Sequence, residues 1–218
     1  MAKTCTQKTN LPILQIKINL LETAPLVWRR VMVREDMNLG VLHAIIQIAM
    51  GWTNSHLHHF LIDGKRYVDP ALDQDRDFSE GEESIDENAW TLLDLLRPDI
   101  TQFEYEYDFG DSWRHLIIVE RIENDSAGFQ DFALCLAGER ACPPEDCGGV
   151  GGFANILEII KNPEHEEYKS MIEWLGKKYN PASFDVGKTN RYLKKLKWEC
   201  PTIEQLGKIL EARDGYRE

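Results

Sequence analysis

Two cysteines bracket a short turn at residues 142–147, where the chain reads Cys-Pro-Pro-Glu-Asp-Cys. Two thiolates separated by four residues fall within the spacing of structural zinc sites, because a tight loop lets both sulfurs approach one ion. Cys135 would add a third ligand, and His115 a fourth if the strands that carry them are neighbours. A structural zinc site normally has two clear ligand pairs, and free cysteine is usually just buried. The sequence therefore favours structural thiols at Cys142 and Cys147, with zinc as the alternative.

The same turn carries two carboxylates, Glu145 and Asp146, which could act in acid–base chemistry or hold a cation. With Asp108, Asp111 and His115 they form the candidate set of catalytic groups or metal ligands, provided that the fold brings them into one pocket. Turn chemistry is the preferred explanation, because two prolines fix the turn and Asp146 can cap backbone amides.

Three further histidines lie within residues 56–60, which read His-Leu-His-His-Phe. If this segment is a strand, His56 and His58 share one face and His59 lies on the other. Paired histidines on one face can bind a metal, or they can lie beside aromatic residues as half-buried polar groups. Because the sequence offers no obvious third ligand, we favour the second interpretation.

Residues 108–110 read Asp-Phe-Gly, a string that holds magnesium in protein kinases. The chain has no kinase glycine-rich loop and no His-Arg-Asp catalytic loop, and aromatic residues alternate with carboxylates over residues 103–109, which is the period of a strand. We therefore predict a β-hairpin with a three-residue turn at 110–112. Its register pairs Phe109 with Trp113, Tyr107 with His115, and Asp108 with Arg114.

Alternating apolar and polar residues predict the other strands of the fold. They lie at residues 13–22, 26–34, 56–68 and 132–137. The first two should form an antiparallel hairpin, and the third should form either a second hairpin or a strand with a bent end around an Asp-Gly turn.

Helical spacing of apolar residues begins at Leu39, behind a cap at Asn38 and ahead of a stop at Gly51. The pattern Ser84-x-x-Glu87 fits a capping box and predicts a short second helix. From residue 154 onward the sequence predicts mainly helix.

Strands first and helices last indicate an α+β fold, an antiparallel sheet of hairpins with packed helices, roll-like, and a helical C-terminal part. We predict a tail at residues 1–12, a single domain at 13–198 and a C-terminal helical extension at 199–218. The N-terminus lacks the apolar core of a signal peptide, and no apolar run is long enough to span a bilayer, so we expect a cytoplasmic protein.

The net charge of −12 argues against non-specific nucleic-acid binding, since the phosphate backbone repels a field of this sign. One basic segment at residues 188–197 could still bind DNA or RNA, although an amphipathic surface helix is the simpler interpretation. Its candidate contacts are Lys188, Arg191, Lys194 and Lys195.

Four strings resemble a known family: Leu-Leu-Asp-Leu-Leu at 92–96, Tyr-Glu-Tyr-Asp-Phe-Gly-Asp-Ser-Trp-Arg-His at 105–115, Gly-Glu-Arg-Ala-Cys-Pro-Pro-Glu-Asp-Cys-Gly-Gly at 138–149, and the motif at 174–185. In order and composition they are similar to the plasmid pRiA4b ORF-3-like family, over most of the chain. The resemblance implies an α+β, roll-like domain, in some cases encoded on plasmids or beside transposable elements. It implies no catalytic residues that could be carried over.

Three hypotheses about function follow. The first is a non-enzymatic binding or adaptor protein with an unknown protein partner, connected with mobile elements, because turn residues on a rigid scaffold are common binding sites. Its binding surface would comprise Asp111, Trp113, His115, Glu145, Asp146, Gly148 and Gly149. The second is a metal-assisted enzyme that uses the carboxylate and histidine set, and the third is nucleic-acid binding. No cofactor is predicted apart from the zinc alternative, and no membrane partner is expected.

Overall fold

The computed structural model describes residues 12–71, 84–123, 129, 131–176, 179–196, 205–206 and 208–209. In chain order its elements are β1 (Ile13–Leu20), β2 (Val27–Arg34), α1 (Leu39–Met50), β3 (His58–Ile62), β4 (Lys65–Val68), β5 (Ser84–Asp86), the 3₁₀ turn η1 (Glu87–Ala89), α2 (Leu92–Leu95), β6 (Gln102–Tyr107), β7 (Trp113–Glu123), β8 (Ala133–Glu139), α3 (Gly149–Lys161), α4 (Tyr168–Leu175) and α5 (Val186–Leu193). Most of the predicted N-terminal tail and C-terminal extension lies outside these residues.

The strands form one eight-stranded sheet in the order β5-β4-β3-β6-β7-β1-β2-β8. Every neighbouring pair is antiparallel except β4 and β5, which run parallel. The predicted antiparallel hairpin of the first two strands is confirmed, with Ile13 opposite Arg34. The α+β fold expected from the order of the elements is confirmed as well.

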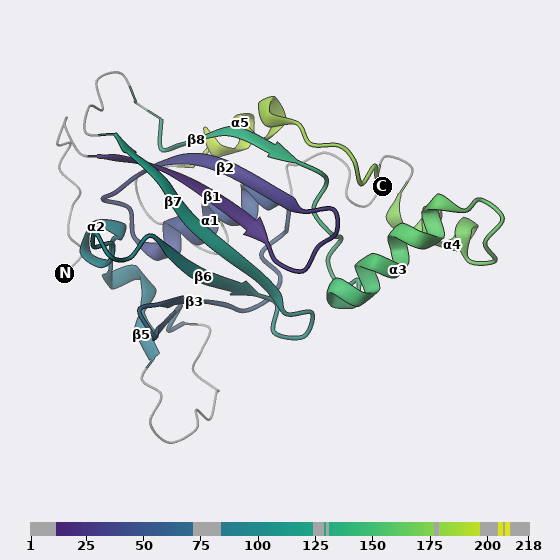
Figure 1. The fold of residues 1–218 in the computed structure, drawn as a ribbon, viewed down its shortest axis with the longest axis horizontal. Coiled ribbons are helices and arrows are strands. Elements are labelled where there is room, and N and C mark those ends of the chain that lie inside the picture. Colours follow the sequence, from purple (N-terminus) through teal and green to yellow (C-terminus); the bar gives the residue numbers. More distant parts are fainter. Residues whose placement is uncertain are drawn as a thin grey trace.

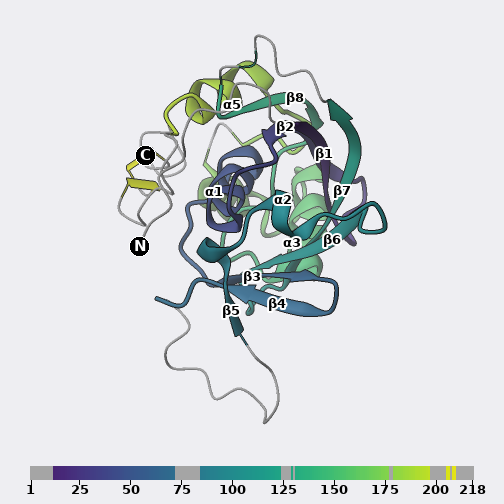
Figure 2. The same cartoon turned by 90° about the vertical axis from the view of Figure 1, so that its left-hand side faces the viewer.

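The sheet curves around α1, as Figure 2 shows, and every residue of this helix is buried. The predicted ends of the helix are confirmed. The side chain of Asn38 accepts a hydrogen bond from the backbone N–H of Val41, and Gly51 ends the helix with a positive φ of 121°. Sheet and helix together enclose the hydrophobic core.

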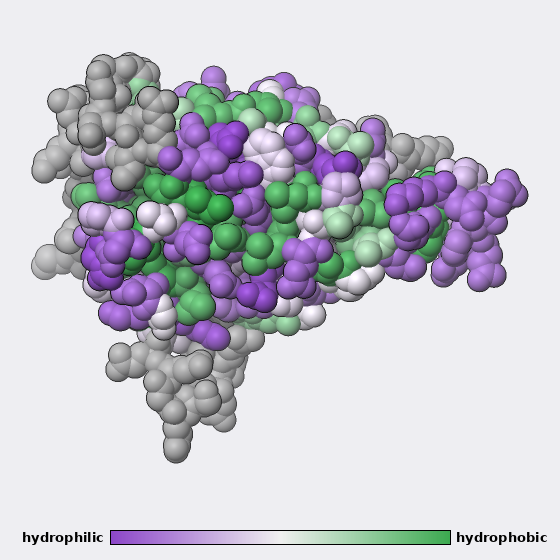
Figure 3. Space-filling model, in the orientation of Figure 1, coloured by the Kyte–Doolittle hydropathy of each residue, from purple (hydrophilic) through white to green (hydrophobic). Residues whose placement is uncertain are grey.

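The outward face of the sheet mixes hydrophobic and hydrophilic residues, as Figure 3 shows. The Lys17 ammonium lies 5.0 Å from the centre of the Trp28 ring. Nearby, Arg30 forms a partly exposed ion pair with Glu120 at 2.6 Å.

The β6–β7 hairpin is confirmed, but the predicted register was wrong: Tyr107 lies opposite Trp113, and Tyr105 opposite His115. The strand ends two residues early because Asp108 has a positive φ of 58° and its side chain accepts a hydrogen bond from the N–H of Gly110. The turn therefore spans residues 108–112. Arg114 pairs with Glu104 at 3.1 Å instead of Asp108.

The capping box predicted at Ser84 and Glu87 was also wrong. Ser84 begins β5, and the buried Glu87 carboxylate contacts His58 instead of a helix end. The short helix α2 begins later, where Thr91 and Asp94 form the capping box.

The C-terminal helices occupy two places. Helices α3 and α4 project from one end of the body, whereas α5 lies along the edge strand β8 (Figure 1). The side-chain amide of Asn190 donates to the carbonyl of Cys135 at 2.9 Å and accepts from its N–H at 2.7 Å, so both backbone groups of this edge-strand residue have a partner. No helix in the described residues has the length and apolar character needed to cross a membrane.

Arg29 on β2 is 1% exposed, and its guanidinium donates hydrogen bonds to backbone carbonyls. The acceptors are Trp28, Ala49, Met50, Glu139 and Arg140, at 2.8 to 3.5 Å. The guanidinium also lies 3.8 Å from the centre of the Phe184 ring. Arg29 therefore holds the end of α1 and the end of β8 together.

A buried polar network lies beneath the loop that follows α1. The rings of His43 and His58 stack at 3.5 Å, and His58 contacts Glu87 at 2.9 Å. His43 Nε2 lies 2.7 Å from Asn54 Oδ1, and His43 Nδ1 lies 2.8 Å from the Tyr105 hydroxyl. Because the amide oxygen of Asn54 can only accept, Nε2 carries the proton and Tyr105 donates to Nδ1. This network fixes Asn54 in the loop.

Burial determines the charge of these groups. It lowers the pKa of His43, His58 and His115 to about 3. It raises the pKa of Glu87 to about 7. The three imidazoles are therefore neutral in the folded protein at neutral pH.

Replacing Arg29 with Met, which has a similar length, should lower the free energy of unfolding by about 3 kcal/mol or more, because several buried carbonyls lose their donor. The Arg30→Met variant on the same strand is the control and should lose less than about 1 kcal/mol, since its ion pair is partly exposed. Urea unfolding measures both values. Equal losses in the two variants would contradict the role assigned to Arg29.

The free energy of unfolding should fall as the pH is lowered from about 7 to about 5, on the order of 1–3 kcal/mol per pH unit. The folded pKa values of His43, His58 and His115 lie below the ordinary value of 6.5, so their contribution is lost as the pH falls towards about 3. Glu87 acts in the opposite sense, because its folded pKa lies above 4.5 and its contribution is lost as the pH rises through about 7. Urea titrations of the Glu87→Gln variant should therefore show a steeper fall with acid, and a shallower one would refute this account.

Candidate functional site

Three loops meet at one end of the sheet: residues 52–57 after α1, residues 108–112 between β6 and β7, and residues 142–148 before α3. The indole N–H of Trp52 donates to the carbonyl of Pro143 at 3.1 Å, which joins the first loop to the third.

Asp108 presents one carboxylate oxygen to this meeting point. Its backbone N–H donates to the carbonyl of Leu57 at 2.9 Å, which places it beside the first loop. Its Oδ1 accepts from the N–H groups of Gly110 and Asp111, at 3.0 and 3.3 Å. These bonds fix a side chain that is only 8% exposed and leave Oδ2 directed at His56.

Glu145 ties the third loop to the other two. Its Oε1 accepts from the Thr53 N–H at 2.7 Å, from the Thr53 hydroxyl at 2.9 Å and from the Tyr107 hydroxyl at 3.1 Å. Burial, together with the neighbouring Glu145 carboxylate, raises the pKa of Tyr107, so its hydroxyl keeps its proton. The same hydroxyl accepts from the N–H of Ser55 at 3.0 Å.

Asp111 fastens the hairpin turn to the start of α3. Its Oδ2 accepts from the N–H of Gly148 at 3.1 Å, at the N-terminus of the helix. Gly149 has a φ of 66°, and a Cβ there would lie 2.6 Å from the carbonyl oxygen of Asp111. The closeness of these two segments therefore requires glycine at position 149.

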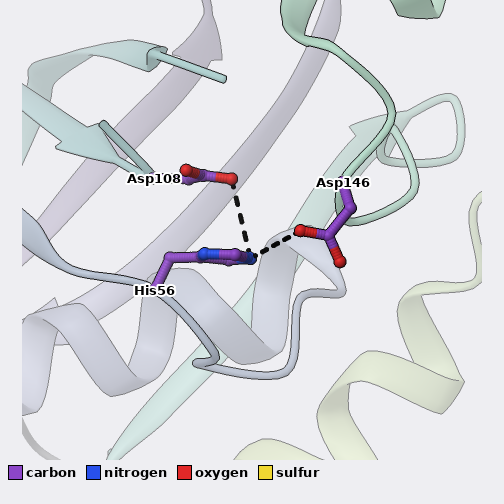
Figure 4. A group of neighbouring side chains, drawn as sticks. All are labelled: His56, Asp108 and Asp146. Atoms are coloured by element: carbon purple, nitrogen blue, oxygen red, sulfur yellow. Dashed lines mark ion pairs between the residues drawn. The ribbon is translucent and has the colours of Figure 1, made fainter. Parts of the chain in front are cut away.

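His56 lies at the centre of the site, as Figure 4 shows. Its Nε2 is 3.2 Å from Asp146 Oδ1, 3.6 Å from Asp108 Oδ2 and 3.8 Å from Glu145 Oε2. This nitrogen is buried, and no group among the described residues forms an aligned hydrogen bond with it. The imidazole also meets the Tyr107 ring edge-on at 5.8 Å.

Two of the distances between these atoms are close to those between neighbouring ligands of one metal ion. Ligands about 2.1 Å from an ion lie about 3.0 Å apart in octahedral and about 3.4 Å apart in tetrahedral coordination. The ligand atoms of His56, Asp108 and Asp146 all lie within 4.8 Å of one another, and two of the separations are 3.2 and 3.6 Å. In the part of the chain that the structure describes, no other such group of His, Cys, Asp or Glu occurs.

Of the five candidate catalytic or ligand residues, the structure brings Asp108, Glu145 and Asp146 together. Asp111 lies at the edge of the site, where it holds the backbone. His115 lies elsewhere: it is 0% exposed, and its Nδ1 lies 3.3 Å from the carbonyl oxygen of Tyr105. Trp113 is also 0% exposed, so neither residue can belong to the predicted binding surface.

His56 is the residue that the sequence analysis missed as part of the site. The second hairpin predicted at residues 56–68 is confirmed as β3 and β4, but β3 begins only at His58. His56 therefore lies in the loop, free of strand alternation, and Asn54 turns the chain there with a φ of 58°. The cluster of histidines was the signal in the sequence for a metal site. The carboxylates that face His56 are far from it in sequence, so no local pattern connects them.

The cysteines do not converge with His115. Cys135 and Cys142 are buried and Cys147 is half-buried, and none of the three forms a disulfide within the described residues. Burial raises the pKa of Cys135 to about 11, and burial followed by the nearby Asp111 charge raises that of Cys147 to about 12, so both sulfurs stay protonated. The zinc alternative at these residues stays a prediction without geometric support among the described residues.

The predicted basic helix is α5. Its apolar residues Tyr192 and Leu193 are buried, whereas Arg191, Lys194 and Lys195 are exposed and Lys188 is half-buried. The arrangement is that of an amphipathic surface helix, and nucleic-acid binding there stays a prediction.

Comparison with known proteins places the chain in a family. A protein from Sinorhizobium fredii (strain NBRC 101917 / NGR234), y4hQ, is 34% identical over 190 residues, which cover 85% of this chain and 94% of that protein. The crystal structure of MM3350 from Methanosarcina mazei Go1, a protein of unknown function, matches with a TM-score of 0.72 and 33% identity, over 82% of this chain and 97% of that one. The profile described as plasmid pRiA4b ORF-3-like protein matches residues 12–188. The chain belongs to the plasmid pRiA4b ORF-3-like family.

Proposed function

We propose that this protein binds one divalent metal ion through His56, Asp108 and Asp146, and that it acts through the open coordination positions of that ion. The observation that carries the proposal is the position of His56 Nε2, a buried nitrogen surrounded by carboxylate oxygens at ligand-to-ligand distances without an aligned hydrogen bond. Lone pairs on nitrogen and oxygen repel one another at these distances unless a proton or a cation lies between them.

The donor set suits a transition metal. One imidazole nitrogen with two carboxylate oxygens is typical of Zn²⁺, Mn²⁺, Fe²⁺ or Co²⁺, whereas Mg²⁺ and Ca²⁺ prefer oxygen ligands alone. Three protein ligands leave at least one position for water or for a substrate, as in catalytic rather than structural sites.

The site is open to solvent on one side. The Asp146 side chain is 63% exposed and that of His56 is 27% exposed, whereas Asp108 is buried beneath them. An ion held there would face the solvent and could polarise a bound water or carbonyl group. These observations support metal-assisted chemistry over a purely structural ion.

The alternative of a non-enzymatic binding surface uses the same region. The hairpin turn and the loop before α3 lie side by side through the contact of Asp111 with Gly148, which supports a common surface. With Trp113 and His115 in the core, that surface consists mainly of the acidic residues that surround His56. A metal ion bound by these acidic residues would then coordinate a group of the partner protein.

Isothermal titration of the metal-free full chain with Zn²⁺ and Mn²⁺ should give about one ion per chain. His56→Ala should weaken binding about 100-fold or more, and Asp146→Asn by about tenfold or more, because each removes a direct ligand. Asp108 and Asp146 both have positive φ values, of 58° and 56°, which asparagine adopts readily, so Asp-to-Asn variants should keep the backbone intact.

The matched control is His165→Ala, which removes a histidine on the α3–α4 connection, remote in sequence from the site. It should bind metal as the unmodified chain does. Unchanged affinity in His56→Ala, or an equal loss in His165→Ala, would overturn the proposed site.

A further inference from the structure

Glu145 lies next to the proposed ligands but outside their group. Its Oε1 is engaged by Thr53 and Tyr107. In the described residues, its Oε2 has only the Tyr107 hydroxyl at 3.3 Å and His56 Nε2 at 3.8 Å. The carboxylate is thus held in a fixed orientation, with one oxygen directed at the place where the ion would lie and with capacity to accept another hydrogen bond.

The charge around the site is strongly negative. Asp108, Asp111, Glu145 and Asp146 all lie there, and among the residues that the structure describes no Lys or Arg forms an ion pair with any of them. One dication neutralises only part of this charge, so the loaded site stays net negative. An anionic ligand such as phosphate would be repelled from it.

Resting on the proposed metal site, we infer that its ligand is an uncharged or cationic molecule that offers a lone pair to the metal and an N–H or O–H group to Glu145. Amides, alcohols, amines and water itself have this pair of functions, whereas phosphate and sulfate esters have the wrong charge. Glu145 is then the specificity-determining residue of the site, because it accepts the hydrogen bond that orients the metal-bound group.

The test uses the Co²⁺-loaded full chain, whose visible absorption reports on ligands that enter the coordination shell of the ion. Pyrazole, which stays neutral when it binds a metal and carries a lone-pair nitrogen next to an N–H group, should change the spectrum at concentrations at least about tenfold below those of inorganic phosphate. Phosphate that binds as tightly as pyrazole would overturn the inference. Failure of the chain to bind Co²⁺ would instead refute the metal site itself.

A second measurement tests Glu145 directly. Glu145→Gln keeps an acceptor oxygen for Thr53 but removes the negative charge, so the variant should retain Co²⁺, bind pyrazole about tenfold more weakly and bind phosphate more tightly. The control Glu173→Gln, on α4, should change neither ligand. If Glu145→Gln keeps the preference for the neutral ligand over phosphate, the role of Glu145 is overturned. If this variant loses Co²⁺, the preference measured with the unmodified chain still decides the ligand class.

Discussion

Among the described residues, the buried guanidinium of Arg29 joins two of the chain segments that lead into the site. Arg29 donates to carbonyls at the end of α1 and at the end of β8, and these are the chain segments that lead into the loops carrying His56 and Glu145. Carbonyl oxygens at a helix C-terminus lack intrahelical partners and carry partial negative charge, so a guanidinium there satisfies them and is itself stabilised. Because Arg29 fixes the ends of α1 and β8, the backbone positions at which the two loops begin are also fixed. The other contacts in the site then orient the side chains.

The orientation comes from hydrogen bonds to backbone groups. Asp108 is held by the amides of its own turn, Glu145 by the amide and hydroxyl of Thr53, and Asp111 by the amide of Gly148. Because these donors hold the carboxylates, several of them lie beside one histidine, and no Lys or Arg in the described part of the chain forms an ion pair with them. The carboxylates therefore keep their negative charge, which attracts the proposed metal ion. The same charge disfavours anionic ligands.

Elements that depend on local sequence patterns could be predicted. The site could be predicted only in part, because its residues come together from distant parts of the chain. Strand alternation and the Asn38 cap are local, so β1, β2 and α1 follow from the sequence. The register of the β6–β7 hairpin could not be predicted in this way, because the Asp108 side chain takes the N–H of Gly110 and ends the strand pairing early. The signal in the sequence was an Asp two residues before a glycine. His56 was missed because its loop is shaped by contacts with the core residue His43, through Asn54, which no local pattern encodes.

The most direct measurement is a crystal structure of the full chain grown with Mn²⁺ or Zn²⁺, with diffraction data collected at the absorption edge of the metal. The account predicts one anomalous peak within about 2.5 Å of His56 Nε2, Asp108 Oδ2 and Asp146 Oδ1, with solvent completing the coordination shell. A structure without a peak at this place, or with the ion bound by the thiols of Cys142 and Cys147, would contradict it.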